Sequence, residues 1–260
     1  MLKTIKQFFG IIYCMDKNYK KINKLRNKTG CALALTIFLT VSVFLTFIIL
    51  NLRMPDSGFI YFGAFLTLFT GVILYYAFYN PQKKKYIKLY KNEIVRNCLD
   101  SVFQDVVYEP QEFFDIEVIQ RANLIQFGNS FKGDDKITAK YKGVQFSLCN
   151  LKIMDIIPNR RFREEIIHFF GTWIILDFCS KSYFENSKNK MTRDYMNALS
   201  KLQALTEGIV LNSFVDNKLH IAINNHVNTF EPPSSDSIEN YHDFVMTEIL
   251  FITEIIDELI

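Results

Sequence analysis

Two long apolar stretches near the start of the chain decide its architecture: CALALTIFLTVSVFLTFIIL at residues 31–50 and GFIYFGAFLTLFTGVILYYAFY at residues 58–79. Neither stretch contains a charged residue, and only residues 51–57 separate them. As helices, both are long enough to cross a hydrocarbon core of about 30 Å. The pattern predicts a transmembrane helical hairpin over residues 31–79, followed by a separate domain over residues 81–260.

The basic residues around the hairpin predict its orientation. The connecting loop carries only Arg53, whereas the two outer flanks are rich in basic residues: Lys3, Lys6, Lys17, Lys20, Lys21, Lys24, Arg26 and Lys28 before it, and Lys83, Lys84, Lys85, Lys88 and Lys91 after it. Because cytosolic flanks of membrane helices carry the excess of Lys and Arg, we expect a two-pass protein of the inner (cytoplasmic) membrane with both termini cytoplasmic. A cleaved signal peptide is disfavoured, since the first apolar run begins only at Cys31 and a second follows at once.

Residues 1–30 read as a basic amphipathic segment. Their apolar side chains recur at near-helical spacing, with lysines between them: Leu2, Ile5, Phe9, Ile12, Tyr19, Ile22 and Leu25. Such a helix either lies on the inner leaflet or packs on the cytosolic domain. Periodicity does not distinguish lipid from protein as the apolar partner, so both alternatives stay open.

Small residues repeat at every fourth position within the two apolar stretches. They are Ala32, Thr36 and Thr40 in the first and Gly63, Thr67 and Gly71 in the second. Small side chains let membrane helices approach closely, so the stripes predict a packing face. An antiparallel register places Thr40 at the depth of Gly71 and Gly63 near the outer end, which leaves part of the glycine stripe free for self-association or another membrane protein.

The charge pattern narrows the possible classes of function. Transporters and proton-coupled machines usually carry ionisable side chains inside the membrane, and these spans have none, which favours an anchor over a transport pathway. An oligomeric pore is an alternative, although its wall would offer little beyond hydroxyl groups. The net charge of +3 resides beside the membrane, where anionic lipids attract basic side chains, so a lipid bilayer rather than nucleic acid is the expected partner.

The cytosolic part, residues 81–260, predicts an α+β fold. Pro81 is expected to end the second span, with a helix over residues 83–106 that Tyr108-Glu-Pro110 breaks. Two hairpins are expected, one over residues 136–149 with a turn at Lys142-Gly143, and one over residues 209–215 and 218–224 around Asp216-Asn217.

The remaining segments complete this picture. In IIHFFGTWIILDF, residues 166–178, apolar side chains occupy both the odd and the even positions, which is typical of a strand covered on both faces. Helices are expected over residues 192–207 and from the N-cap Ser237 to the end of the chain, where Glu248 and other acids fill the polar positions. We therefore expect mostly antiparallel strands packed by helices.

No pattern in the chain predicts catalysis, a metal site or a cofactor. Its four histidines and five cysteines show no zinc-ligand spacing, and no glycine-rich phosphate loop or nucleophile elbow occurs. Gly133-Asp134-Asp135 precedes an expected strand and is read as a turn rather than a cation site. Arg160, Arg161 and Arg163 are candidates for contact with an anion or lipid headgroup, although the following Glu164 and Glu165 favour a solvated loop.

The order of several motifs resembles a bacterial family of membrane-anchored proteins, the domain of unknown function 3137 family. After the hairpin come KKYIKLYKNEIVRNCL at residues 84–99, FFGTWIILDF at residues 169–178 and SFVDNKLHIAI at residues 213–223, followed by Phe230-Glu-Pro232. The resemblance implies a membrane-anchored cytosolic domain and supplies no catalytic or binding residues. The chain resembles a shortened member, because only residues 179–190 join the second of these motifs to the next helix.

Together, these patterns favour a non-enzymatic, membrane-anchored cytosolic binding or scaffold domain. A membrane-tethered enzyme or a nucleotide or lipid sensor with an unrecognised pocket is the first alternative, and polar groups with perturbed pKa values converging in one place would support it. An oligomeric pore is the second alternative.

Overall fold

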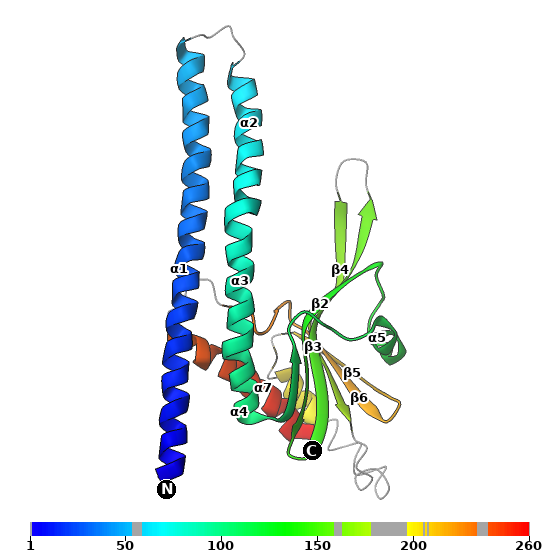
Figure 1. Ribbon diagram of the computed structural model, residues 1–260. Helices are drawn as coiled ribbons and strands as arrows, with labels where there is room; N and C mark the ends of the chain where they lie inside the picture. Colours follow the sequence, from blue (N-terminus) through cyan, green and yellow to red (C-terminus); the bar gives the residue numbers. More distant parts are fainter. Residues whose placement is uncertain are drawn as a thin grey trace, which may run out of the picture. The chain divides into compact units, whose positions relative to one another are not determined.

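Two compact units make up the chain, Met1–Glu93 and Ile94–Ile260. The computed structural model describes residues 2–53, 59–158, 163–177, 197–204, 206, 208–232 and 239–259. In these ranges the first unit is helical, and the second combines helices with a six-stranded antiparallel sheet (Figure 1). The α+β fold class predicted from the sequence is confirmed.

The first unit is built from two long helical segments. Helix α1 runs over Leu2–Arg53, while α2 (Phe59–Leu74), the π-helical segment η2 (Tyr75–Tyr79) and α3 (Asn80–Tyr90) follow one another without a break. Helix α1 packs along this second segment (Figure 1). Tyr19–Arg53 and Ile60–Val102 are long and apolar enough to cross a membrane, and only 6% of each apolar window is buried.

Helix α1 is uninterrupted through the basic N-terminal segment. The segment therefore belongs to the same helix as the first apolar stretch, and whether its apolar side chains contact lipid or protein stays an open prediction.

The helix that contains the second apolar stretch does not end at Pro81. Proline has no N–H to donate within a helix, and the turn before it is π-helical, with the Asn80 N–H bonded to the Tyr75 carbonyl. Pro81 then occupies the first turn of α3, the position where a missing N–H costs least. The helical path continues through η3 (Lys91–Val95) and α4 (Arg96–Val102).

The sheet contains six strands in the order β1-β2-β3-β4-β6-β5. Their bounds are Gln104–Glu109, Ser130–Tyr141, Val144–Pro158, Arg163–Asp177, Ile209–Val215 and Lys218–Asn224 for β1 to β6. Both predicted hairpins are present, because Lys142-Gly143 and Asp216-Asn217 take the positive φ values that tight turns require.

The helix predicted over residues 83–106 ends four residues early. Phe103 is extended and β1 begins at Gln104. Strand β1 pairs with β2, which sets Tyr108 opposite Ile137, and both side chains are buried. Burial of an aromatic side chain within the sheet outweighs the small local preference for continuing the helix.

Both faces of the sheet are buried. One face packs against α5 (Ile116–Ala122), a short helix that the sequence did not predict, and Trp173 lies in this core. Side chains of opposite parity, such as Leu148 and Ile174, are equally buried; Phe103 at the end of α4 lies on this second face against Phe146, with ring centroids 4.9 Å apart. Helix α7 (Glu239–Leu259) packs against α4. From Phe169 to Leu176, strand β4 is thus covered on both faces, as its sequence predicts, whereas Ile166 and Ile167 are exposed.

Two further predictions are only partly within the described residues. Of the helix expected over residues 192–207, residues 197–204 are described and helical, and the proposed N-cap Ser237 lies outside the described residues. Strand β2 begins at Ser130, so Gly133-Asp134-Asp135 is part of a strand. The prediction of a turn there is wrong, because pairing with β3 carries the strand through a bulge between Asp134 and Ile137.

Candidate functional site

The helical hairpin brings the predicted small residues to its inner face. A Cβ atom on Gly71 would lie 3.2 Å from Cγ2 of Thr40, so these two residues share one depth, as the rise per residue predicts. A Cβ on Gly63 would lie 2.3 Å from Cβ of Phe47. The expectation that Gly63 belongs to a free part of the stripe is wrong, because the Phe47 side chain occupies that space.

The threonines of the stripes bond within their own helices. Thr36 donates to the Ala32 carbonyl at 2.8 Å, Thr40 to the Thr36 carbonyl at 2.7 Å, and Thr67 to the Gly63 carbonyl at 2.7 Å. Each of these hydroxyl groups therefore forms its hydrogen bond within its own helix and not with the other helix. Close packing at Gly63 and Gly71 is what brings α1 and α2 together.

Of the predicted arginine cluster, Arg163 lies at the far end of the β3–β4 ribbon. Arg163 is exposed and pairs with Pro158, while Arg160 and Arg161 lie outside the described residues. Beyond the pair Ser130–Met154, strand β2 ends and only β3 and β4 continue. We call residues 155–158 and 163–167 the β3–β4 arm; Ile157, Ile166 and Ile167 on it are each about two-fifths exposed.

A buried polar network, which the sequence did not predict, crosses the second unit. Asn150 on β3 lies at its centre: its Nδ2 donates to the Thr229 carbonyl at 3.0 Å, and its Oδ1 accepts from the Thr229 hydroxyl at 2.6 Å. Its Nδ2 also lies 3.5 Å from Asp135 Oδ2. The Tyr108 hydroxyl donates to the other oxygen of Asp135. The network therefore joins β1, β2, β3 and the loop after β6.

Helix α7 is connected to this network through Glu248. Its Oε2 accepts the backbone N–H of Phe230 at 2.8 Å, directly after Thr229. Phe230 is fully buried with φ at 62°, so its amide is fixed towards the helix. The last helix is thereby bonded to the loop that Asn150 also holds.

Acidic side chains gather around the same network. Asp134, Asp135 and Glu231 each offer a carboxylate oxygen, and these oxygens lie within 4.8 Å of one another. Oxygen donors of this kind suit a hard divalent cation. Asp135 is completely buried and accepts the hydrogen bond of the Tyr108 hydroxyl. Asp134 and Glu231 are the more accessible members of this acidic group.

The burial of the network perturbs two pKa values. Burial raises the pKa of Glu248 to about 7; Asp135 and Glu231 add to the rise, and the Phe230 N–H opposes it. Burial and the neighbouring Asp135 carboxylate raise the pKa of Tyr108 far above its ordinary value. Near neutral pH Glu248 is thus poised between its two protonation states.

Two signals in the sequence point towards this network. Asn150 interrupts an apolar run, LCNLKIM at residues 148–154, in phase with the buried side chains Phe146 and Leu148. Glu248 follows Val245 by three residues and precedes Ile252 by four, so helical spacing places it on the apolar face of α7. The expectation that Glu248 fills a polar position of this helix is therefore wrong.

No protein-family model, curated protein or solved structure matches this chain.

Proposed function

We propose that this chain is a two-pass protein of the cytoplasmic membrane whose hairpin anchors a non-enzymatic cytosolic domain that binds a protein partner. The hairpin carries the first part of the proposal. Large apolar side chains cover its outside, with Phe38, Phe65 and Leu68 each about 70% exposed. A continuous apolar surface of this kind is unfavourable in water and is expected in contact with lipid.

The proposed orientation rests on charge. Of the residues between Lys17 and Asn92, the basic ones lie almost entirely on the two flanks that face away from the short loop, and the single acid, Asp56, is in the loop. This asymmetry supports cytoplasmic termini and a cytosolic second unit. The resemblance to the domain of unknown function 3137 family agrees with this arrangement, and we propose membership as a shortened relative.

The β3–β4 arm supports the binding role. A two-stranded ribbon is marginally stable in water by itself, and this one keeps three isoleucines exposed. Exposed apolar side chains on a projecting ribbon offer an anchor for another protein chain. We propose the arm as the partner-binding element of a scaffold domain.

The topology is tested with a reporter enzyme that is active only outside the cytosol. Fused after Ile260 it is expected to stay silent, and inserted between residues 54 and 58 it is expected to be active. An active fusion after Ile260 contradicts the proposed orientation.

The binding role is tested by gentle solubilisation of membranes and mass spectrometry of co-purified proteins. A variant with Ile157→Thr and Ile166→Thr in the arm is expected to lose a partner that the wild-type chain retains, whereas Val107→Thr on the exposed edge strand β1 serves as the matched control. If both variants retain the same proteins, the arm is not the binding element.

The alternatives make different predictions in the same preparation. The convergence of Asp135, Glu231 and Glu248 would favour a sensor if a nucleotide or lipid co-purified and was lost in an Asp135→Asn variant. A pore requires ion flux through liposomes that contain the purified chain, and absence of flux with the hairpin intact excludes it.

A further inference from the structure

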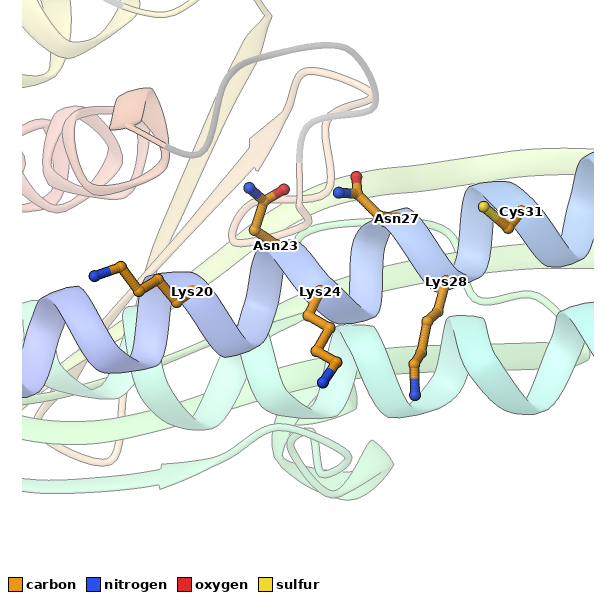
Figure 2. Close-up of a pocket in the computed structure, with 6 residues that line it drawn as sticks. All are labelled: Lys20, Asn23, Lys24, Asn27, Lys28 and Cys31. Atoms are coloured by element: carbon orange, nitrogen blue, oxygen red, sulfur yellow. The ribbon is translucent and has the colours of Figure 1, made fainter.

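The N-terminal half of α1 presents one polar face. Lys20, Asn23, Lys24, Asn27 and Lys28 stand at positions i, i+3, i+4, i+7 and i+8, which share a single helix face; we call these five residues the α1 polar face. They line an open hollow of about 580 Å³ together with Cys31. Figure 2 shows the two asparagines directed to one side of the hollow and Lys24 and Lys28 to the other, so amide and ammonium groups flank it.

The chemistry of this face selects an anion. It offers three ammonium groups and two amides, and all five side chains are exposed. From Lys17 to the end of α1 at Arg53 the sequence contains no Asp or Glu, so no carboxylate lies within one helical turn of Lys24 or Lys28 on this helix. Lysine ammonium and amide N–H groups are suitable partners for phosphate oxygens, and we assign the direct contacts to Lys24 and Lys28.

The position along the helix selects the source of that anion. Lys28 and Lys24 precede Cys31, the first residue of the apolar stretch, by three and seven residues, which corresponds to about 5 and 10 Å of helix rise. The polar headgroup layer extends about 5–8 Å beyond the hydrocarbon core on each side. Lysine side chains also reach along the helix towards the interface, so both ammonium groups fall at the level of lipid phosphates.

We propose that the α1 polar face binds the headgroup phosphate of an anionic phospholipid, with Lys24 and Lys28 as direct contacts and Lys20 at the cytosolic margin. This inference rests on the proposed membrane insertion of the hairpin. It adds a defined site on one helix to the general attraction between a basic protein and an anionic leaflet.

The second helical segment provides a matched control for charge. Thr40 and Gly71 share one depth, and counting twelve residues towards the cytosol from each reaches Lys28 on α1 and Lys83 on α3. Lys83, Lys84 and Lys85 therefore enter the headgroup layer at about the same level and are equally exposed to it. Removing either trio of lysines removes the same charge, and the second trio lies at the level of Lys28.

The test uses the full chain in nanodiscs that contain equal amounts of phosphatidylcholine and phosphatidylglycerol. After transfer to mild detergent, the lipids that stay bound are measured by native mass spectrometry. The wild type is expected to retain phosphatidylglycerol preferentially. The variant K20Q/K24Q/K28Q is expected to lose that preference by about tenfold or more, from the typical contribution of lysines near an anionic surface, and K83Q/K84Q/K85Q by less than about threefold.

Different outcomes contradict the headgroup site, the lipid as its ligand, or the membrane anchor. Equal losses in the two variants, or none in the first, overturn the proposed site in favour of diffuse attraction. Displacement of the bound lipid by soluble glycerol phosphate overturns the lipid as the ligand. A chain that fails to co-migrate with nanodiscs contradicts the membrane anchor itself, whereas one that co-migrates without lipid preference contradicts only the headgroup site.

Discussion

Glu248 Oε2 and the backbone N–H of Phe230 lie 2.8 Å apart, so a titratable side chain of the last helix fixes a buried loop amide. Burial and neighbouring acids raise the pKa of this carboxyl to about 7 from 4.5. The folded chain therefore holds this proton more tightly than the unfolded chain does. The contribution of Glu248 to stability is greatest below about pH 4.5 and falls as pH rises to about 7.

We expect Glu248→Gln to make the second unit more stable at pH 8 by about 1–2 kcal/mol, because the amide oxygen still accepts the Phe230 N–H and carries no charge. The unfolding midpoint of the detergent-solubilised chain, followed by fluorescence of Trp173, the only tryptophan, should also vary less between pH 5 and 8. Glu254→Gln on the same helix is the control. An unchanged pH profile in E248Q would show that this carboxyl is not the titrating group.

The central position of Asn150 predicts a large cost for its removal. Asn150→Leu leaves the Thr229 hydroxyl and the Asp135 carboxylate without their bonds to this side chain, and buried polar groups that lose partners destabilise a fold by about 1–3 kcal/mol each. We expect a loss of about 2–4 kcal/mol in urea unfolding of the second unit. Thr138→Val, which removes a 3.0 Å bond to the Ser147 hydroxyl on the same sheet, should cost less than about 1 kcal/mol. Similar losses in both variants would contradict a special role for the network.

The two glycines of the hairpin should respond differently to alanine. A Cβ on Gly63 meets Cβ of Phe47 at 2.3 Å, whereas a Cβ on Gly71 meets the Thr40 methyl group at 3.2 Å. Gly63→Ala is therefore expected to separate α1 and α2, and Gly71→Ala to have little effect. Spin labels at cysteines introduced at Asn51 and Tyr61 measure the separation in a background without native cysteines.

A second substitution makes this test selective. Phe47→Ala retains the Cβ atom that causes the overlap and is expected to leave the G63A hairpin separated. Phe47→Gly removes that atom and is expected to restore the short distance. If neither glycine variant changes the distance, the hairpin does not pack through these positions.

Gly171 allows β4 and β6 to approach each other. A Cβ at this position would lie 2.0 Å from the Ile223 carbonyl oxygen, which is backbone and has little room to move. Gly171→Ala is expected to destabilise the second unit by about 1–3 kcal/mol, measured by urea unfolding with Trp173 fluorescence. Gly30→Ala is the control, because a Cβ there meets nothing within 4 Å. This variant should leave the unfolding transition of the second unit unchanged.

Local signals explain why much of the fold was predictable. Lys142-Gly143 and Asp216-Asn217 specify their turns through residues adjacent in sequence, and the hairpin follows from two uninterrupted apolar runs. The turn predicted at Asp134-Asp135 was wrong because a distant strand, and not the adjacent residues, determines the structure there. Acids after glycine favour a turn, but pairing with β3 extends the strand through them, and that partner is visible only in three dimensions.

The buried network was not predictable because its bonds join distant parts of the chain. Tyr108 and Asp135 are 27 residues apart, and Asn150 and Thr229 are 79 apart. Each residue by itself resembles an ordinary surface side chain in sequence. Only Glu248 and Asn150 gave a signal in the sequence, because each occupies a position that its helix or strand periodicity assigns to buried apolar side chains.

The length of α1 determines which of its charges a bilayer attracts. From Leu2 to Gly30 the helix rises about 40 Å, whereas physiological salt screens a surface potential within about 8 Å. In the proposed membrane, Lys24 and Lys28 experience that potential, whereas the first turns of α1 lie several screening lengths away. Those turns are therefore electrostatically independent of the lipid.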